Sequence, residues 1–251
     1  MTARGRVSPG QSVGTLTISG NYTQAITGQL NIEINGKGSS DLLHVSSSAI
    51  LAGALNVVLS GYAPRAGETF TILTAANVNG SFSAISGSAP WPGLGWQAQY
   101  GSSSVSLVVT GRPQLASYDT YASYHNLGAG SFLLDANNNG QPNLLEYALG
   151  NSPTGNVWRS GNSIGASNGW FQLCFPRNAD ATDINYYVEA ATMLENGGDW
   201  NCILSNVNVS GWLGPATFTE SGASNGIIEV VVTDVPTNTP SRFLRLRVSK
   251  P

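Results

Sequence analysis

The sequence is poor in charged residues. Only 10% of its 251 residues are Asp, Glu, Lys or Arg, whereas ordinary soluble domains carry about 25%. The 11 basic and 14 acidic residues give a net charge of −3, so no basic field is present to attract nucleic acid. Solubility must come from Ser, Thr, Asn and Gly, which favours an extracellular or cell-surface β-protein over a cytosolic enzyme.

Long hydrophobic runs and catalytic motifs are also missing. No run approaches the roughly 18 apolar residues of a membrane helix, so we expect no membrane span. A strand-like pattern begins by about Val7 without the apolar core of a secretion signal, which favours a piece of a longer gene product over a mature form. The sequence holds two histidines, His44 and His125, and no nucleophile, zinc or nucleotide fingerprint. We therefore expect no enzymatic activity.

Cysteine is equally scarce. Cys174 and Cys202 are the only two, and in an oxidising compartment such a pair can form a disulfide. The alternative is two separate thiols packed as small hydrophobic side chains. Strand alternation leaves the choice open, because it turns Cys174 outward and places Cys202 on the same face as Trp200.

Short alternating runs separated by glycine fill the first 110 residues. The unit G-x-L-x-[IV] begins at Gly14, Gly28 and Gly53, at spacings of 14 and 25 residues. Stacked rungs of a β-solenoid with loops of variable length would produce this pattern. A β-sandwich with glycine-rich turns is the alternative.

This N-terminal region resembles the β-strand repeats associated with bacterial autotransporter passengers and large surface proteins. The resemblance rests on Val7–Gln24, on Leu30–Ile34, on Asp41–Val45 and on Ala66–Thr74. It implies a right-handed β-helix-like fold, extracellular or surface placement, and a structural or adhesive role without catalytic residues.

A different pattern occupies residues 112–154. Tyr118, Tyr121 and Tyr124 have helical spacing, and Leu144–Leu149 before Gly150 indicates a short helix with a glycine stop. Between them, Asp135–Glu146 matches the calcium-loop pattern D-x-[DN]-x-[DN]-G-x5-E at every fixed position.

The same segment resembles the calcium-binding repeats of the dockerin and thrombospondin type 3 kind. The resemblance implies calcium held by the side chains of Asp135, Asn137, Asn139 and Glu146 and by the backbone carbonyl of Gln141, with Asn143 at a position often bridged by water. Only two of these ligands carry charge, so we expect weak binding, with a dissociation constant of roughly 10⁻⁴ to 10⁻³ M. We expect the calcium to stiffen a joint between two β-domains. In the alternative, the asparagines form an Asx-type turn and Glu146 is solvated.

The last part, residues 155–251, contains five strand-like runs separated by turn-rich segments, which is typical of a β-sandwich. With the pattern Asp180–Ala190 followed by Trp200, and with the closing Arg242–Val248, this part resembles the small sandwich domain that ends many secreted proteins of environmental bacteria. The resemblance implies a fold more than an activity. The runs are Trp170–Phe175, Ile184–Ala190, Trp200–Leu204, Ile227–Val232 and Phe243–Val248.

Two functions follow as hypotheses. The first is a subunit of a bacterial surface fibre that self-assembles through strand edges, with Val13, Thr15, Leu16 and Ile18 as the possible donor strand. The second is a carbohydrate-binding or adhesive module for a cell-surface polysaccharide, with Trp91, Trp96 and Tyr100 as a possible sugar platform. The fold class that we expect is mainly β, with a solenoid-like (or sandwich) domain over 1–111, a helical calcium-loop linker over 112–154 and a sandwich over 155–251.

Overall fold

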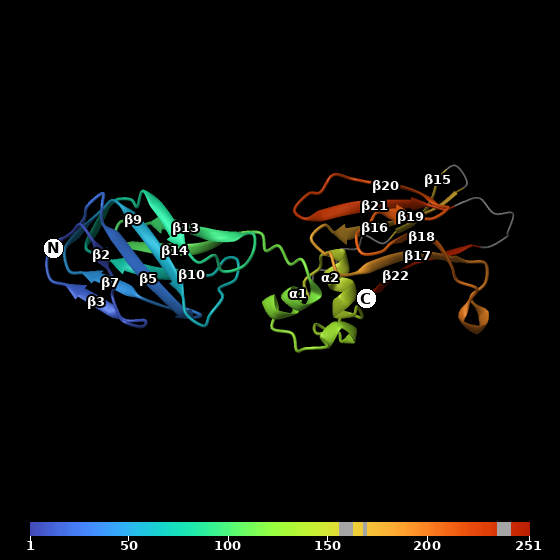
Figure 1. The fold of residues 1–251 in the computed structure, drawn as a ribbon, viewed down its shortest axis with the longest axis horizontal. Helices are drawn as coiled ribbons and strands as arrows, with labels where there is room; N and C mark the ends of the chain where they lie inside the picture. The colour runs from blue at the N-terminus through green and yellow to red at the C-terminus, as the bar shows by residue number, and fades with distance from the viewer. Residues whose placement is uncertain (156–162, 168–169, 235–241) are drawn as a thin grey trace. The chain divides into compact units, whose positions relative to one another are not determined.

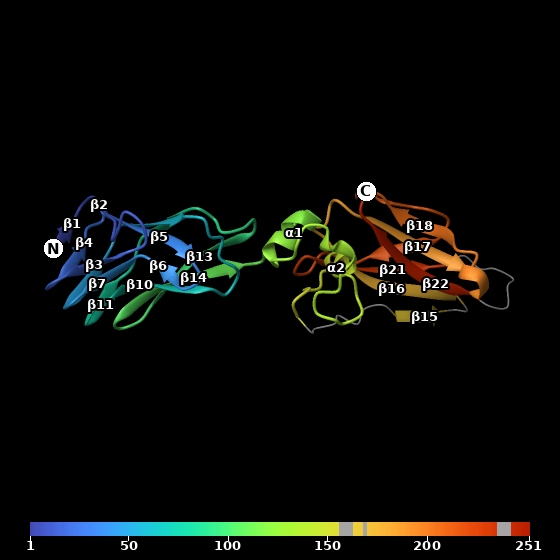
Figure 2. The same ribbon diagram turned by 90° about the horizontal axis from the view of Figure 1, so that it is seen from below.

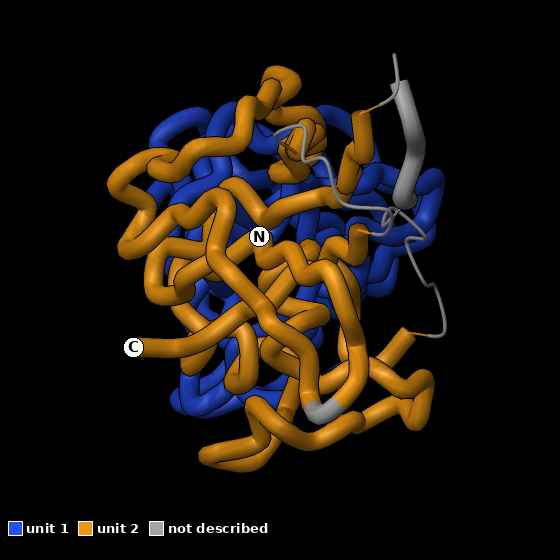
Figure 3. Tube along the Cα trace, turned by 90° about the vertical axis from the view of Figure 1, so that its right-hand side faces the viewer, with its two compact units in different colours: residues 1–114 blue, residues 115–251 orange. Residues whose placement is uncertain are grey.

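The chain forms two compact units, Met1–Gln114 and Leu115–Pro251, which Figure 3 colours separately. The structure, a computed structural model, describes residues 1–155, 163–167, 170–234 and 242–251. It is mainly β, with 47% strand and 8% helix, as the sequence predicts. The expected helical linker, 112–154, does not form a body of its own: from Leu115 onward it belongs to the second unit.

Unit 1 has a β-solenoid-like arrangement of three sheets (Figures 1 and 2). Their strand orders are β1-β4-β8-β11, β2-β5-β9-β12 and β3-β7-β10-β14-β13. Neighbours are parallel except at β10-β14 and β14-β13, where a hairpin adds two antiparallel strands. The strands are β1 Thr2–Ala3, β2 Arg6–Val7, β3 Thr15–Ile18, β4 Tyr22–Gln24, β5 Gln29–Gly36, β7 Leu42–Val45, β8 Ser48–Leu51, β9 Ala54–Leu59, β10 Thr69–Thr74, β11 Asn77–Gly80, β12 Ala84–Gly87, β13 Leu94–Tyr100 and β14 Ser104–Gly111, with the short β6 Ser39–Ser40 beside β5.

The core of unit 1 consists of columns of apolar side chains that point inward from successive rungs. In one column Leu30 of β5 lies in register with Leu55 of β9, and both are fully buried. In the third sheet Leu43 of β7 is in register with Leu73 of β10 and is also fully buried. Because side chains alternate between the two faces of a strand, a strand needs only every second residue to be apolar to fill such a column.

The repeated G-x-L-x-[IV] unit does not stack as a single series. The units that begin at Gly28 and Gly53 form β5 and β9, which pair directly. The unit that begins at Gly14 forms β3, which pairs with β7 in another sheet. The expectation that all three units stack was therefore wrong, because the 14-residue spacing crosses from one sheet to the next while the 25-residue spacing spans a full rung.

Unit 2 contains a sandwich of two four-stranded sheets, with the orders β15-β16-β21-β20 and β19-β18-β17-β22. All strand pairs are antiparallel. The five expected strands are present, and the described residues add three shorter ones that the sequence pattern missed, β15, β19 and β20. The bounds are β15 Ser163–Ser167, β16 Trp170–Asn178, β17 Asn185–Ala191, β18 Asn201–Asn206, β19 Trp212–Leu213, β20 Thr217–Glu220, β21 Ile227–Thr233 and β22 Phe243–Ser249.

Two short helices of unit 2, α1 (Tyr118–Tyr124) and α2 (Asn143–Leu149), lie where the sequence predicts them. Ser117 caps α1 by accepting a hydrogen bond from the Thr120 amide, and Gly150 ends α2 in the left-handed conformation, φ 73°. A 3-10 turn, Ser131–Leu133, lies between them, and another, Glu195–Gly197, follows β17.

Hydrogen bonds fix α2 to the sandwich. The Tyr147 hydroxyl donates to Asp183 at 2.9 Å, and the Tyr186 hydroxyl donates to the Ala148 carbonyl at 2.8 Å. Asn178 donates its side-chain amide to the Tyr147 carbonyl at 3.1 Å. Tyr147 and Ala148 are fully buried, so the helix forms part of the hydrophobic core of unit 2.

The described residues include no helix long and apolar enough to cross a membrane. The longest helices in this part of the chain, α1 and α2, have seven residues each.

Candidate metal site and binding surfaces

The Asp135–Glu146 loop is organised by the carboxylate of Asp135. This carboxylate accepts hydrogen bonds from the amide of Asn139 at 3.1 Å and from the amide of Gly140 at 2.7 Å. Gly140 has φ 87°, a conformation that side-chain-bearing residues rarely adopt. The chain therefore turns sharply around Asp135, as the pattern predicts.

Two asparagines connect the turn to Glu146. The side-chain oxygens of Asn137 and Asn139 accept hydrogen bonds from the amides of Asn139 and Gln141, at 3.2 and 2.8 Å. Their side-chain amide groups both donate to Oε1 of Glu146, each at 2.9 Å. Four of the five expected ligands therefore lie close together. They are Asp135, Asn137, Asn139 and Glu146, which this network of hydrogen bonds connects.

Glu146 is fully buried, and its Oε2 atom has no hydrogen-bond partner. The alternative to calcium binding, in which Glu146 is solvated beside an Asx-type turn, is wrong for Glu146, although the Asx-type turns themselves are present. Burial raises the pKa of the Glu146 carboxyl, the hydrogen bonds from Asn137 and Asn139 oppose the rise, and the negative charge of Asp135 adds to it. A buried carboxylate oxygen without a partner is costly.

The two remaining residues named for the loop, Gln141 and Asn143, differ in their surroundings. Gln141 is buried, and its side-chain Oε1 has no partner either. Asn143 does not occupy a water-bridged position: it is fully buried, its oxygen accepts from the Ala136 amide at 3.2 Å, and its amide donates to the Ser131 carbonyl at 2.9 Å. Asn143 therefore fastens the loop to the segment before it.

The donor set of the loop fits a calcium ion. Asp135, Asn137, Asn139, Gln141 and Glu146 provide only oxygen ligands, which Ca²⁺ prefers. No group of three or more His, Cys, Asp or Glu side chains that could hold a metal occurs among the described residues. The loop itself offers two carboxylates and otherwise amide and carbonyl oxygens, so it does not form a group of that kind.

All hydrogen bonds of the loop join residues of unit 2. Asn137 also donates to the Gly155 carbonyl at 2.8 Å, and Glu146 lies on α2, which is fixed to the sandwich. The loop is therefore part of unit 2. The expected role of calcium in stiffening a joint between two β-domains stays a prediction.

The three residues of the expected sugar platform, Trp91, Trp96 and Tyr100, differ in exposure: Tyr100 is exposed, whereas Trp91 and Trp96 are half-buried. In the hairpin, Trp96 and Tyr100 are in register with Val109 and Val105, which point into the core and are buried. The Trp96 indole donates to the Ser88 carbonyl at 2.9 Å and packs edge-on against Phe70. The Tyr100 hydroxyl accepts from the Phe82 amide at 3.0 Å. Packing against the solenoid accounts for Trp96, whereas Tyr100 is 39% exposed, and the sugar platform stays a prediction.

Trp91, the third expected member, is half-buried. Its indole donates to the Ala63 carbonyl at 3.2 Å. Hydrogen bonding of an indole to a backbone carbonyl is the usual arrangement for a tryptophan that anchors a loop.

The possible disulfide is not formed, because Cys174 and Cys202 are both free thiols. Cys174 lies in β16 between the buried Leu173 and Phe175, so it points away from the sandwich core. Cys202 is exposed on β18 in the opposite sheet. Two outward-facing positions of opposite sheets, which pack about 10 Å apart, are too distant to be bridged.

The possible donor strand lies at the edge of a sheet. Thr15, Leu16 and Ile18 belong to β3, which is the terminal strand of its sheet. Val13 precedes the strand and is half-buried. Ile18 is buried and Leu16 half-buried, whereas Thr15 is exposed, so the strand presents one apolar and one polar face.

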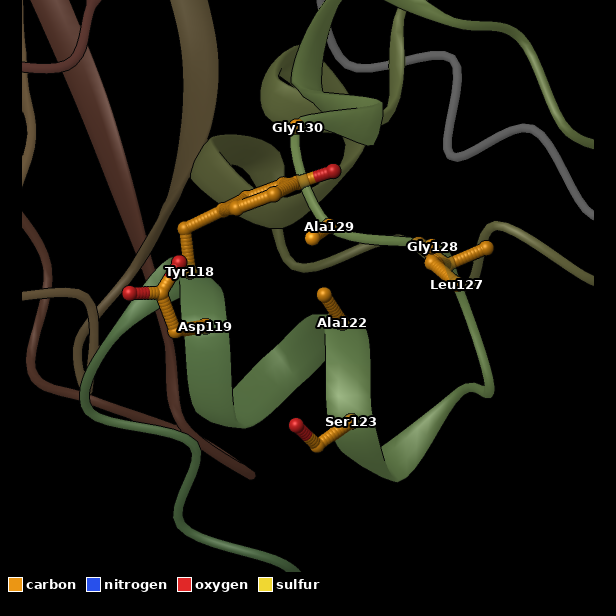
Figure 4. Close-up of a pocket in the computed structure, with 8 residues that line it drawn as sticks. All are labelled: Tyr118, Asp119, Ala122, Ser123, Leu127, Gly128, Ala129 and Gly130. Carbon is orange, nitrogen blue, oxygen red and sulfur yellow. The ribbon is translucent and has the colours of Figure 1, made fainter.

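A small pocket of about 180 Å³ lies beside α1 (Figure 4). The ring of Tyr118 and the methyl groups of Ala122 and Ala129 face it, and Asp119 lies at its edge. Tyr118 donates to or accepts from Ser131 at 2.9 Å, and burial raises the pKa of its phenol.

Sequence reasoning missed a cluster on the outer face of the second sandwich sheet. Glu189 of β17 accepts a hydrogen bond from Nε of Arg245 at 2.8 Å and from Nε of Arg247 at 2.7 Å. The sequence does show that Arg245 and Arg247 share one face of a strand, because Leu246 between them is apolar. The partner carboxylate, 56 residues away from Arg245, could not be identified from the sequence.

No protein-family model matches this chain, and no curated protein matches it.

Proposed function

We propose that this protein is a non-enzymatic structural protein of the cell surface or extracellular space that self-assembles through an open strand edge. The observation that carries the proposal is the position of β3, which has a strand partner on one side only within the described chain. Strand edges of this kind pair readily with another chain. The low charge content and the surface rich in small polar residues also support extracellular placement.

The open edge of β3 offers a specific pair of residues. The carbonyls of Gly14 and Ile18 accept hydrogen bonds from β7 and the residue after it, Leu42 and Ser46, at 2.9 and 3.0 Å. Backbone groups alternate in direction along a strand, so Thr15 and Thr17 turn their amides and carbonyls toward the open side. Neither charge nor proline protects this edge.

A pair of variants at Thr17 tests the assembly. Thr17→Pro removes an amide that points to the open edge while leaving the hydrogen bonds to β7 in place, and edge strands tolerate proline. Thr17→Ala keeps the amide and serves as the matched control. We expect filaments or large oligomers in electron microscopy and sedimentation for the wild type and Thr17→Ala, and monomers for Thr17→Pro. Wild-type protein that stays monomeric at high concentration contradicts the proposal.

We also propose that the Asp135–Glu146 loop binds calcium as a structural ion of unit 2. The observation that carries this proposal is the buried, unpartnered Oε2 of Glu146. A cation at this position would satisfy that oxygen and stabilise the turn that precedes α2. With two carboxylates among the ligands, we expect binding in the range of roughly 10⁻⁴ to 10⁻³ M.

The variant Glu146→Gln tests calcium binding, because it removes the buried charge and keeps the size of the side chain. In EDTA we expect the variant to melt at or above the temperature of the wild type, since the uncompensated carboxylate is gone. Millimolar calcium should raise the melting temperature of the wild type and leave that of the variant unchanged. Equal responses of the two proteins to calcium overturn the proposal.

An adhesive role toward a polysaccharide is the second candidate function. The Trp91, Trp96 and Tyr100 set offers little support for it, because both tryptophans are half-buried and bonded to backbone carbonyls, which leaves Tyr100 as the one exposed ring of the three. The observation that favours it lies instead on the sandwich, where two arginines lie over aromatic rings.

A further inference from the structure

The outer face of the sheet β19-β18-β17-β22 carries two arginines in fixed positions. Side chains alternate along β22, and Leu244 points into the sandwich core, so Arg245 and Arg247 both point outward. Arg245 is directly opposite Glu189 of β17, and Arg247 is opposite Tyr187. β22 is the terminal strand of its sheet (Figure 1), so both arginines lie at an accessible border of the sandwich.

Each guanidinium is held in two ways. The guanidinium carbon of Arg245 lies 4.0 Å from the centre of the Trp200 ring, and that of Arg247 lies 4.0 Å from the centre of the Tyr187 ring. Their Nε atoms donate to the two oxygens of the same carboxylate, Glu189. Cation–π contact and a charge-assisted hydrogen bond together restrict the arginine rotamers.

The remaining donors of both arginines are available. The side chains of Arg245 and Arg247 are 43% and 45% exposed, while that of Glu189 is 9% exposed. Within the described part of the chain no hydrogen bond engages the terminal Nη atoms of either residue. One carboxylate faces two guanidiniums, so the cluster carries an excess of one positive charge that cannot be lost by deprotonation.

We propose that Arg245 and Arg247 form a binding site for the carboxylates of an acidic polysaccharide, that is, of a chain containing uronic acid residues. Guanidinium groups match planar carboxylates with paired hydrogen bonds. The two arginines are two residues apart on one strand, about 6.8 Å between Cα atoms, so they can engage carboxylates spaced along an extended polymer.

The small number of arginines favours this partner over nucleic acid. Nucleic-acid affinity depends on many neutralised phosphates, and two phosphate contacts would supply little affinity at physiological salt. A uronate polymer combines separated carboxylates with sugar rings that can lie on a flat face. The site therefore extends the adhesive candidate function, and it does not depend on the assembly proposed for β3 or on calcium.

The test uses the full chain and three polymers: polygalacturonate, neutral dextran and dextran sulfate. By isothermal titration at low salt we expect binding to polygalacturonate, no binding to dextran, and weaker or no binding to dextran sulfate. Absence of binding to polygalacturonate overturns the inference. Equal binding to dextran sulfate overturns it as well, because it would show a general attraction to polyanions.

Matched double variants locate the site. Arg245→Gln/Arg247→Gln should weaken polygalacturonate binding at least tenfold. Arg4→Gln/Arg6→Gln removes the same two charges, at the same spacing, from exposed positions of unit 1, and we expect unchanged affinity. An equal loss in both double variants would assign the effect to net charge and contradict the proposal.

A third variant separates recognition from folding. The double variant Arg245→Gln/Arg247→Gln leaves Glu189 buried without its partners, so circular dichroism must show that this double variant is folded. Arg245→Lys/Arg247→Lys keeps both charges for Glu189 but lacks the planar fork, and we expect about a fivefold or greater loss of affinity. Wild-type affinity in this folded variant would overturn the assigned recognition by guanidinium groups.

Discussion

Gln24 is a buried polar side chain that joins two rungs of the solenoid. Its amide lies 2.8 and 2.9 Å from the carbonyls of Ala52 and Ala54, and its oxygen accepts from the Tyr22 hydroxyl at 3.0 Å. Gln24 is 1% exposed. A buried carbonyl that loses its donor keeps the full cost of its desolvation, so Gln24 stabilises the corner that follows β4 and β8.

We predict that Gln24→Leu lowers the free energy of unfolding of unit 1 by about 1–3 kcal/mol. The substitution is similar in volume but removes the Gln24 amide from the Ala52 and Ala54 carbonyls. Urea denaturation followed by tryptophan fluorescence measures the effect, and Gln97→Ala, at an exposed position of β13, is the control. A loss no larger than that of the control would show that the corner is held in another way.

Glu189 makes the stability of unit 2 depend on pH. Burial alone would raise the pKa of Glu189, but the hydrogen bonds and positive charges of Arg247 and Arg245 outweigh it and hold the pKa below its ordinary value. A depressed folded-state pKa stabilises the protein fully above the unfolded-state value of about 4.3, and this stabilisation is lost as the pH falls through the folded-state pKa.

We therefore predict that the difference in stability between wild type and Glu189→Gln is largest near neutral pH. The difference should shrink below about pH 4.3, because the carboxyl of the wild type then becomes protonated. Denaturation curves of both proteins between pH 3 and pH 7 measure it. A difference that does not change with pH would mean that the arginines do not stabilise the charged form.

At the scale of elements, the corners of the solenoid require close approach of backbone to backbone. Gly53 has φ 63°, and a Cβ atom there would meet the carbonyl oxygen of Gly28 and lie 2.6 Å from that of Ala25. Gly61 has a similar φ of 71° but has no atom within 4 Å of a Cβ position. The two glycines therefore share the backbone strain and differ only in the space around them.

This pair gives a prediction that separates the two effects. Gly61→Ala should cost about 1–2 kcal/mol, the penalty of a left-handed conformation for a residue with a Cβ. Gly53→Ala should cost clearly more, because the added carbon collides with backbone that cannot move aside without opening the rung. Chemical denaturation of both variants measures the difference, and equal costs would show that the corner at Gly53 relaxes.

At the scale of the whole molecule, each unit has its own hydrophobic core. Unit 1 buries columns such as Leu30 and Leu55, and unit 2 buries Phe175, Val188 and Val230. The candidate calcium loop and α2 belong to unit 2. Stabilisation by an ion that binds only the folded state follows mass action, so calcium acts on the unit that contains its ligands.

We predict two thermal transitions in calorimetry, of which calcium shifts only one. Addition of calcium at ten times its dissociation constant should stabilise unit 2 by about 1.4 kcal/mol, and EDTA should reverse the shift. A single transition would contradict the independence of the two cores. A shift of both transitions by calcium would place the ion elsewhere than in the loop of unit 2.

Much of the architecture could be predicted from local pattern. Alternation in Ile227–Val232 and in Phe243–Val248 identified β21 and β22, because a strand with one buried face needs an apolar residue at every second position. By contrast, all four residues of β20, Thr217–Glu220, are exposed, so no apolar face marked that strand. The neighbouring β21 defines it, through pairing that the sequence does not display.

The amino-acid sequence by itself determined the β class, both helices and the Asp135–Glu146 turn, because each depends on contacts within a few residues. Tertiary structure alone decided which strands stack, that Glu146 is buried with one oxygen unpartnered, and that the loop belongs to unit 2. It also brought Glu189 to Arg245 and Arg247 and set Cys174 and Cys202 on opposite sheets. These outcomes depend on long-range pairing, whose register follows from the packing of whole sheets and not from any local run of residues.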